Sequence, residues 1–128
     1  MRKEFITDFE LYLCEKFGYR NCIHVSPTRN GFCVCVREKE LYLYIRFWDY
    51  SAGIGNFPDN CIILVTCDFT KNKERNIRDL VQFFKEYAPR YDYKYIGIEN
   101  NPVLNGMLQW KDVAGNAFDN QAIPLTEA

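Results

Sequence analysis

The sequence predicts an α/β domain of the α+β kind, in which one mixed sheet of five to six strands carries the helices. An antiparallel meander forms the first part of this sheet, and a strand–helix–strand–helix unit completes it. Two apolar, β-branched runs, residues 61–67 and 93–98, enclose a helical pattern. Because a helix between two strands of one sheet is a crossover, these two strands should be parallel neighbours. The length of 128 residues fits a single domain.

The N-terminal part predicts one helix and three strands. Residues 3–17 repeat apolar side chains at helical spacing, and Gly18 suits the left-handed conformation that closes helices. Strands are expected at 21–25, 32–36 and 41–48, with turns at Pro27–Gly31 and Glu38–Lys39. The third strand alternates strictly, so its odd and even positions should face opposite sides of the sheet.

The C-terminal part predicts two helices. Apolar residues recur at helical spacing over 76–87, between the two parallel strands. A second helix should begin at Asn101-Pro102, a favoured cap followed by proline, and run to Trp110. Residues 111–128 are weakly patterned, with an edge strand expected at Val113–Phe118.

Composition narrows the class of protein. Hydrophobic residues make up 48% and aromatic residues 16% of the chain, which is typical of a folded globule. Lysine and arginine number 16 against 17 aspartate and glutamate, which argues against nucleic-acid or membrane binding through bulk charge. With no signal-peptide pattern and no apolar run near the roughly 20 residues of a membrane helix, we expect a cytoplasmic protein.

The six cysteines are predicted to be reduced thiols. Cys61 and Cys67 bracket an apolar strand, where buried free thiols act as small hydrophobic groups. One metal-site alternative exists, because a hairpin could bring two pairs of ligands to one side of a sheet: Cys22, His24, Cys33 and Cys35. Zinc sites favour Cys-x₂₋₄-Cys on turns over Cys-x-Cys on flat strands, so we expect no metal.

The turn after the first parallel strand is predicted to bind an anion. Cations there oppose the positive end of the helix macrodipole unless an anion lies between them and the free backbone N–H groups. The predicted phosphate or anion site consists of Lys71, Lys73, Arg75, Asn76 and Arg78. The competing interpretation is a solvated turn, in which Glu74 and Asp79 partly offset the charge.

Polar residues follow the two parallel strands and are predicted to border a crevice. In open α/β sheets, ligands bind beyond the carboxyl ends of the strands. The crevice residues are Thr66, Asp68, Glu99, Asn100 and Asn101. Strand-end polarity and helix capping are the simpler interpretation for each one separately. The glycine-rich stretch 51–56 does not open a helix, so it is interpreted as a flexible connection rather than a phosphate loop.

A third candidate is a partner-binding face on the strand at 41–48. Tyr42, Tyr44, Arg46 and Trp48 share one side of this strand, and aromatic residues interleaved with arginine can anchor a protein partner. The competing interpretation is that the helix over 76–87 covers this side.

The order of elements resembles the GNAT acetyltransferase superfamily, from an N-terminal helix through a meander to strand, helix, strand and helix. In that family the turn after the fourth strand carries Arg/Gln-x-x-Gly-x-Gly/Ala, whose glycines admit the coenzyme A pyrophosphate. Lys73, Asn76 and Arg78 stand at the matching positions, so Arg78 replaces a small residue. The tyrosine that often acts as general acid is absent near Leu108–Trp110. The resemblance implies coenzyme A or acetyl-CoA as cofactor and acyl transfer as activity.

Two functions therefore stay open. The first is a GNAT-like acyltransferase or acyl-CoA binder that uses the basic turn. The second is a non-catalytic protein-binding module, such as an inhibitor or immunity protein, that uses the aromatic strand. Substitution of two family glycines by Asn76 and Arg78 weighs against the first.

Overall fold

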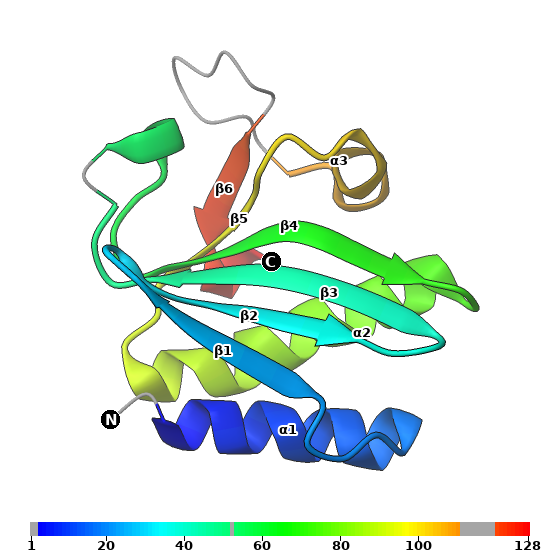
Figure 1. The fold of residues 1–128 in the computed structure, drawn as a ribbon. Helices are drawn as coiled ribbons and strands as arrows, with labels where there is room; N and C mark the ends of the chain where they lie inside the picture. Colours follow the sequence, from blue (N-terminus) through cyan, green and yellow to red (C-terminus); the bar gives the residue numbers. More distant parts are fainter. Residues whose placement is uncertain (1–2, 52, 111–119) are drawn as a thin grey trace.

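The computed structural model describes residues 3–51, 53–110 and 120–128. A six-stranded mixed sheet runs in chain order from β1 to β6, and two long helices cover one of its faces (Figure 1). The strands are β1 (Ile23–Thr28), β2 (Gly31–Arg37), β3 (Leu41–Trp48), β4 (Cys61–Phe69), β5 (Tyr95–Ile98) and β6 (Gln121–Pro124). The helices are α1 (Lys3–Phe17), α2 (Lys73–Tyr87) and α3 (Pro102–Leu108). Short 3₁₀ turns are η1 (Ile54–Asn56), η2 (Ala88–Tyr91) and η3 (Leu125–Glu127).

The predicted fold class is confirmed. β1, β2, β3 and β4 pair antiparallel as a meander, and β4 and β5 are parallel neighbours joined through α2. None of the described helices combines the length and the apolar composition needed to cross a membrane.

Several predicted boundaries are wrong. Pro27 lies inside β1 rather than in a turn, because the hairpin to β2 turns only through residues 29–30. An edge strand tolerates proline where its nitrogen faces away from the neighbouring strand. α2 begins at Lys73, earlier than expected, and α3 ends at Leu108. β6 was not predicted, and the edge strand expected at Val113–Phe118 lies outside the described residues.

An aromatic cluster holds α1 and α2 against the sheet. The ring of Phe5 on α1 lies 5.8 Å from that of Phe47 on β3 in an edge-to-face arrangement. Phe9 makes the same kind of contact with Phe84 of α2 at 5.4 Å. All four side chains are fully buried. A hydrogen bond lies at the margin of this cluster, where the Tyr91 hydroxyl donates to Asp8 over 2.7 Å.

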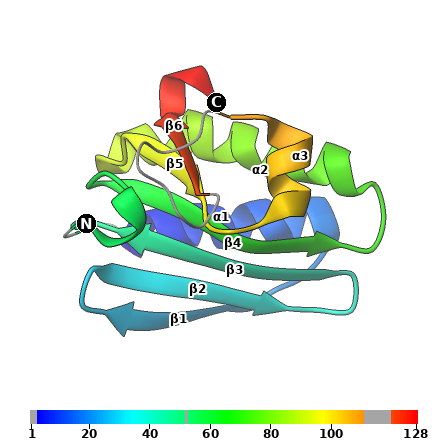
Figure 2. The same ribbon diagram turned by 90° about the horizontal axis from the view of Figure 1, so that it is seen from above.

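The alternation of β3 decides which sheet face the helices cover. Leu43, Ile45 and Phe47 join the main core with residues of α1 and α2. The opposite side of β3 therefore faces away from both helices, and the interpretation that α2 covers Tyr42 and Tyr44 is wrong. Figure 2 views the sheet from this outer side and shows β1, β2 and β3 with no described helix in front of them.

α3 lies beside the second half of β4, where β5 no longer pairs with that strand. β4 pairs with β5 only from Cys61 to Leu64, and Val65 forms a bulge where the register with β3 shifts. Beyond this point α3 lies beside β4 (Figures 1 and 2). The predicted cap is confirmed, because the Asn101 side chain accepts from Leu104 N over 3.1 Å. Its amide also donates to Val65 O over 2.9 Å, which ties α3 to the bulge.

We predict that Phe84→Ala lowers the free energy of unfolding by about 3–5 kcal/mol, because it opens a cavity among buried rings. Urea denaturation followed by circular dichroism measures the change. Leu11→Ala is the matched control, since Leu11 is 55% exposed and its truncation should change stability by no more than about 0.5 kcal/mol. Equal effects of the two substitutions would contradict the assignment of this core.

Candidate functional site

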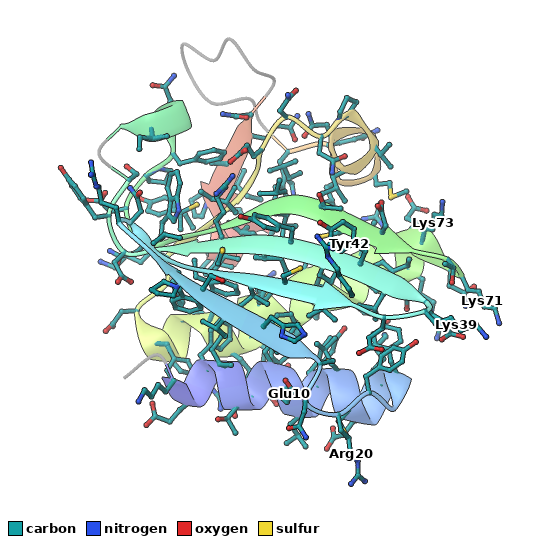
Figure 3. The ribbon with its side chains drawn as sticks, viewed as in Figure 1. Glu10, Arg20, Lys39, Tyr42, Lys71 and Lys73 are labelled. Carbon is teal, nitrogen blue, oxygen red and sulfur yellow. The ribbon has the colours of Figure 1, made fainter. Side chains whose placement is uncertain are left out.

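The basic turn lies at one end of the molecule. Lys71 and Lys73 lie near Lys39 of the β2–β3 turn (Figure 3), and the two turns are joined by a 3.0 Å hydrogen bond from Thr70 N to Glu40 O. Lys71, Lys73 and Arg75 are exposed. The cap residue of α2, Asn72, makes no capping hydrogen bond with its side chain.

The predicted anion-binding residues do not surround one cavity. A cavity of about 240 Å³ beside this turn is lined by Lys71 and Asn76 but also by Glu40. The Asn76 amide donates inward to Lys71 O over 2.9 Å. Arg78 points to the other flank of α2, where it donates to Met107 O of α3 over 2.9 Å and pairs with Glu74 at 3.3 Å. The turn is therefore an exposed mixture of charges, with Arg78 engaged in tethering α3.

The predicted crevice residues divide into three groups. Thr66 and Asp68 lie on β4 beyond the bulge, opposite Tyr44 and Tyr42 of β3. Asn101 is used in capping α3 and in binding Val65 O. Only Glu99 and Asn100 line a common cavity. The grouping fails because β4 continues past the end of β5, so the two parallel strands do not end at the same level.

The predicted partner-binding residues do share one surface. We call the sheet face opposite α1 and α2 the outer face; its open part consists of Cys35, Arg37, Tyr42, Tyr44, Arg46, Thr66 and Asp68. Their alternation along β2, β3 and β4 brings them to this side. Tyr42 and Tyr44 are half-buried, which leaves parts of both rings accessible.

Arginine and tyrosine side chains organise this open part. The Arg37 guanidinium lies 5.2 Å from the centre of the Tyr42 ring, and that of Arg46 lies 5.4 Å from Tyr44. A hydrogen bond with the Cys33 thiol and partial burial raise the pKa of Tyr44 above its ordinary value. The open part therefore presents aromatic rings in contact with neighbouring cations.

A cavity of about 370 Å³ adjoins these residues on the outer face, and we call it the Arg46–Glu99 pocket. Arg46 Nε donates to Glu99 Oε1 over 3.0 Å, and both side chains are about one-third exposed. Trp48 and Phe57, which meet edge to face at 6.2 Å, also line the pocket. The pocket thus combines an ion pair with an aromatic wall.

Glycine and asparagine residues place the η1 turn over the sheet. A Cβ atom on Gly97 of β5 would lie 2.6 Å from the Phe57 ring, so only glycine lets this ring rest on the strand. Asn120 is 2% exposed; its amide donates to Gly55 O over 3.1 Å and its oxygen accepts from Asn100 N over 3.0 Å. The stretch interpreted as a flexible connection is therefore anchored.

Four residues that line the pocket were not predicted as site residues: Ile54, Gly55, Phe57 and Asn120. The signal for Phe57 was Gly97, since a glycine inside an apolar strand marks a close approach. No local pattern identifies Asn120, whose partners lie 20 and 65 positions away in the chain.

The cysteines lie on both sides of the sheet and all six are free. Cys22 is buried in the main core, whereas His24 pairs with Cys35 on the outer face, so the four ligands of the alternative metal site are not brought together. The described residues contain no cluster of three or more His, Cys, Asp or Glu side chains placed for a metal. Burial raises the pKa of the Cys61 and Cys67 thiols, and burial with the nearby Glu10 raises that of Cys22 to about 11.

Comparisons of the chain with protein-family models, curated proteins and solved structures gave no match. The geometry of the described residues therefore carries the functional inference.

We predict that Gly97→Ala lowers the free energy of unfolding by about 1–3 kcal/mol, because the added methyl group displaces the Phe57 ring. Gly106→Ala is the matched control: nothing lies within 4 Å of a Cβ atom there, so it should be neutral or stabilising by up to about 1 kcal/mol. Urea titrations measure both values. A neutral Gly97→Ala would show that the ring does not rest on β5.

Proposed function

We propose that this protein is a non-catalytic binding module whose outer face docks a protein partner. The observation that carries the proposal is a sheet face that none of the described helices covers, with Tyr42, Tyr44 and Arg46 beside the Arg46–Glu99 pocket. Tyrosine, tryptophan and arginine are the residues that most often dominate binding energy at protein interfaces. A partner side chain can enter the pocket while the partner's surface covers the two tyrosine rings.

The charges on this face favour a protein over nucleic acid. Arg46 is paired with Glu99, and Asp68 lies opposite Tyr42 in the register of β3 and β4. With a formal net charge of −1 for the chain, no excess of cations is available to neutralise a phosphate backbone. The same balance suits an interface with mixed polar groups at its rim. We propose a cytoplasmic location, in keeping with six free thiols.

Acyl-CoA binding by a GNAT-like domain is the second candidate, with acyl transfer as the activity if the protein is an enzyme. The parallel β4–β5 pair, which separates at the Val65 bulge, favours it. Two contacts weigh against it. Asn101 already binds Val65 O, and Arg78 joins α2 to α3. A coenzyme A chain passing between these elements would have to displace both contacts.

Titration with acetyl-CoA and coenzyme A separates the two candidates. We expect no change in melting temperature with either ligand. Under the second candidate, ligand at 100 times its dissociation constant would add about 2.7 kcal/mol, and Lys73→Ala/Arg75→Ala would abolish that shift. A shift that the double variant removes would contradict the proposed function.

Two matched double variants test the outer face. Tyr44→Ala/Arg46→Ala should reduce recovery of bound proteins from an extract of the native cells at least tenfold, equivalent to about 1.4 kcal/mol. Lys73→Ala/Arg75→Ala, which leaves the outer face intact, should recover the same proteins as the wild type in quantitative mass spectrometry. Circular dichroism confirms that each variant is folded. Equal recovery by both variants would refute the proposal that the outer face binds the partner.

A further inference from the structure

β1 lies at the edge of the sheet, and among the described strands it pairs only with β2 (Figure 1). An edge strand presents unpaired backbone groups that can template pairing with another chain. The register of β1 shows which of its N–H groups face this open side. Thr28 and Gly31 close the two-residue hairpin and form its first hydrogen-bonded pair. Because hydrogen-bonded and non-bonded pairs alternate, the nitrogen atoms of Ile23, Val25 and Pro27 face outward.

The carboxylate of Glu10 on α1 binds the first of these outward-facing N–H groups, that of Ile23. This carboxylate accepts from Ile23 N over 3.3 Å and from Cys22 N over 2.9 Å. These hydrogen bonds agree with the register, since an N–H group bonded to a side chain cannot also bond to β2. Figure 3 shows Glu10 on the part of α1 that lies below β1. A charged acceptor therefore holds the backbone donors at the start of the strand.

Pro27 removes the third donor. Its nitrogen carries no hydrogen, and its outward orientation lets proline occupy a strand without loss of a bond to β2. Of the outward nitrogen atoms in β1, only that of Val25 keeps an N–H group available. An antiparallel pair of two copies would then keep only the two reciprocal hydrogen bonds between the Val25 residues, and it would lose those that donors at positions 23 and 27 would add.

The protected edge lies beside an apolar surface. Val25 is 48% exposed, and a groove of about 550 Å³ runs along the strand, lined by Lys3, Ile6, Val25, Pro27, Gly31, Phe32 and Asp49. The strand is self-complementary about Val25: in an antiparallel pair of two copies, Val25 would face Val25 and Ile23 would face Pro27. Such a contact is isologous and closes as a dimer with two-fold symmetry.

We propose that Glu10 and Pro27 prevent β1 from pairing with the β1 strand of a second copy of this chain. Association of two copies through this edge requires release of the Ile23 N–H from Glu10 and a donor at position 27. The edge and the outer face are different surfaces, so this proposal does not depend on the proposed function.

The test is the double variant Glu10→Ala/Pro27→Val. It releases the Ile23 N–H and adds an N–H at position 27, so that all three outward positions carry an available donor. In sedimentation experiments over a concentration series, the wild type should stay monomeric, and the double variant should approach twice the monomer mass. Glu15→Ala is the control, since it removes the same charge from an exposed position of α1. Adding Val25→Lys to the double variant should restore the monomer, because a charge on an edge strand blocks pairing.

Amide hydrogen exchange of the wild type tests the geometry independently of any variant. The Ile23 amide should exchange slowly and the Val25 amide rapidly, because only the first has an acceptor. A protected Val25 amide, a double variant that remains monomeric, or association that Val25→Lys does not reverse would each overturn the proposal. A wild-type dimer that Val25→Lys dissociates would overturn it as well.

Discussion

Burial of one aromatic cluster between the sheet and two helices is the constraint on which the rest of the structure depends. Phe5, Phe47 and Phe84 come from α1, β3 and α2 and meet in one place. Because both long helices must bury their apolar stripes there, both lie on the same face of the sheet. The opposite face of β1, β2 and β3 therefore carries none of the described helices. Tyr42, Tyr44 and Arg46 of β3 remain partly accessible there, whereas Trp48 is only 5% exposed. The candidate site follows from this asymmetry.

The sequence predicts those elements whose signal is local. The helical spacing in α1, the strict alternation of β3 and the Asn101-Pro102 cap each depend on neighbouring residues, and all three are present. The parallel β4–β5 pair also follows, because a crossover helix leaves few alternatives. Contacts between elements far apart in the sequence cannot be predicted from such local patterns. Periodicity identifies the apolar stripe of α2 but not the sheet face on which it packs, and this is why the interpretation of the Tyr42 side was wrong.

Pro27 and β6 illustrate the same limit. Proline is a turn residue in most contexts, and its place inside β1 depends on the strand lying at an edge with the right register. β6 has only four residues and weak alternation, and pairing with β5 rather than its own composition defines it. Both features depend on which strands become neighbours, and that is decided by the whole fold.

The candidate site was predictable only in part. Cations close together in the sequence at residues 71–78 do not converge in space, since Arg78 turns towards α3. The Arg46–Glu99 pocket instead gathers residues from β3, η1, the end of β5 and the residue before β6. Arg46 and Glu99 were each identified from the sequence, but in two different predicted sites. Their ion pair shows that the two predicted sites meet at one place on the outer face.

Thiol labelling followed residue by residue shows whether the outer face is open to solvent. Cys35 lies half-buried on that face between His24 and Tyr44, whereas Cys22 and Cys67 lie in the core beneath the helices with raised pKa values. Brief alkylation of the native protein at neutral pH, mapped by peptide mass spectrometry, should modify Cys35 well before Cys22 or Cys67. Modification of Cys35 only as fast as the two core thiols would show that the outer face is covered, and would contradict the account.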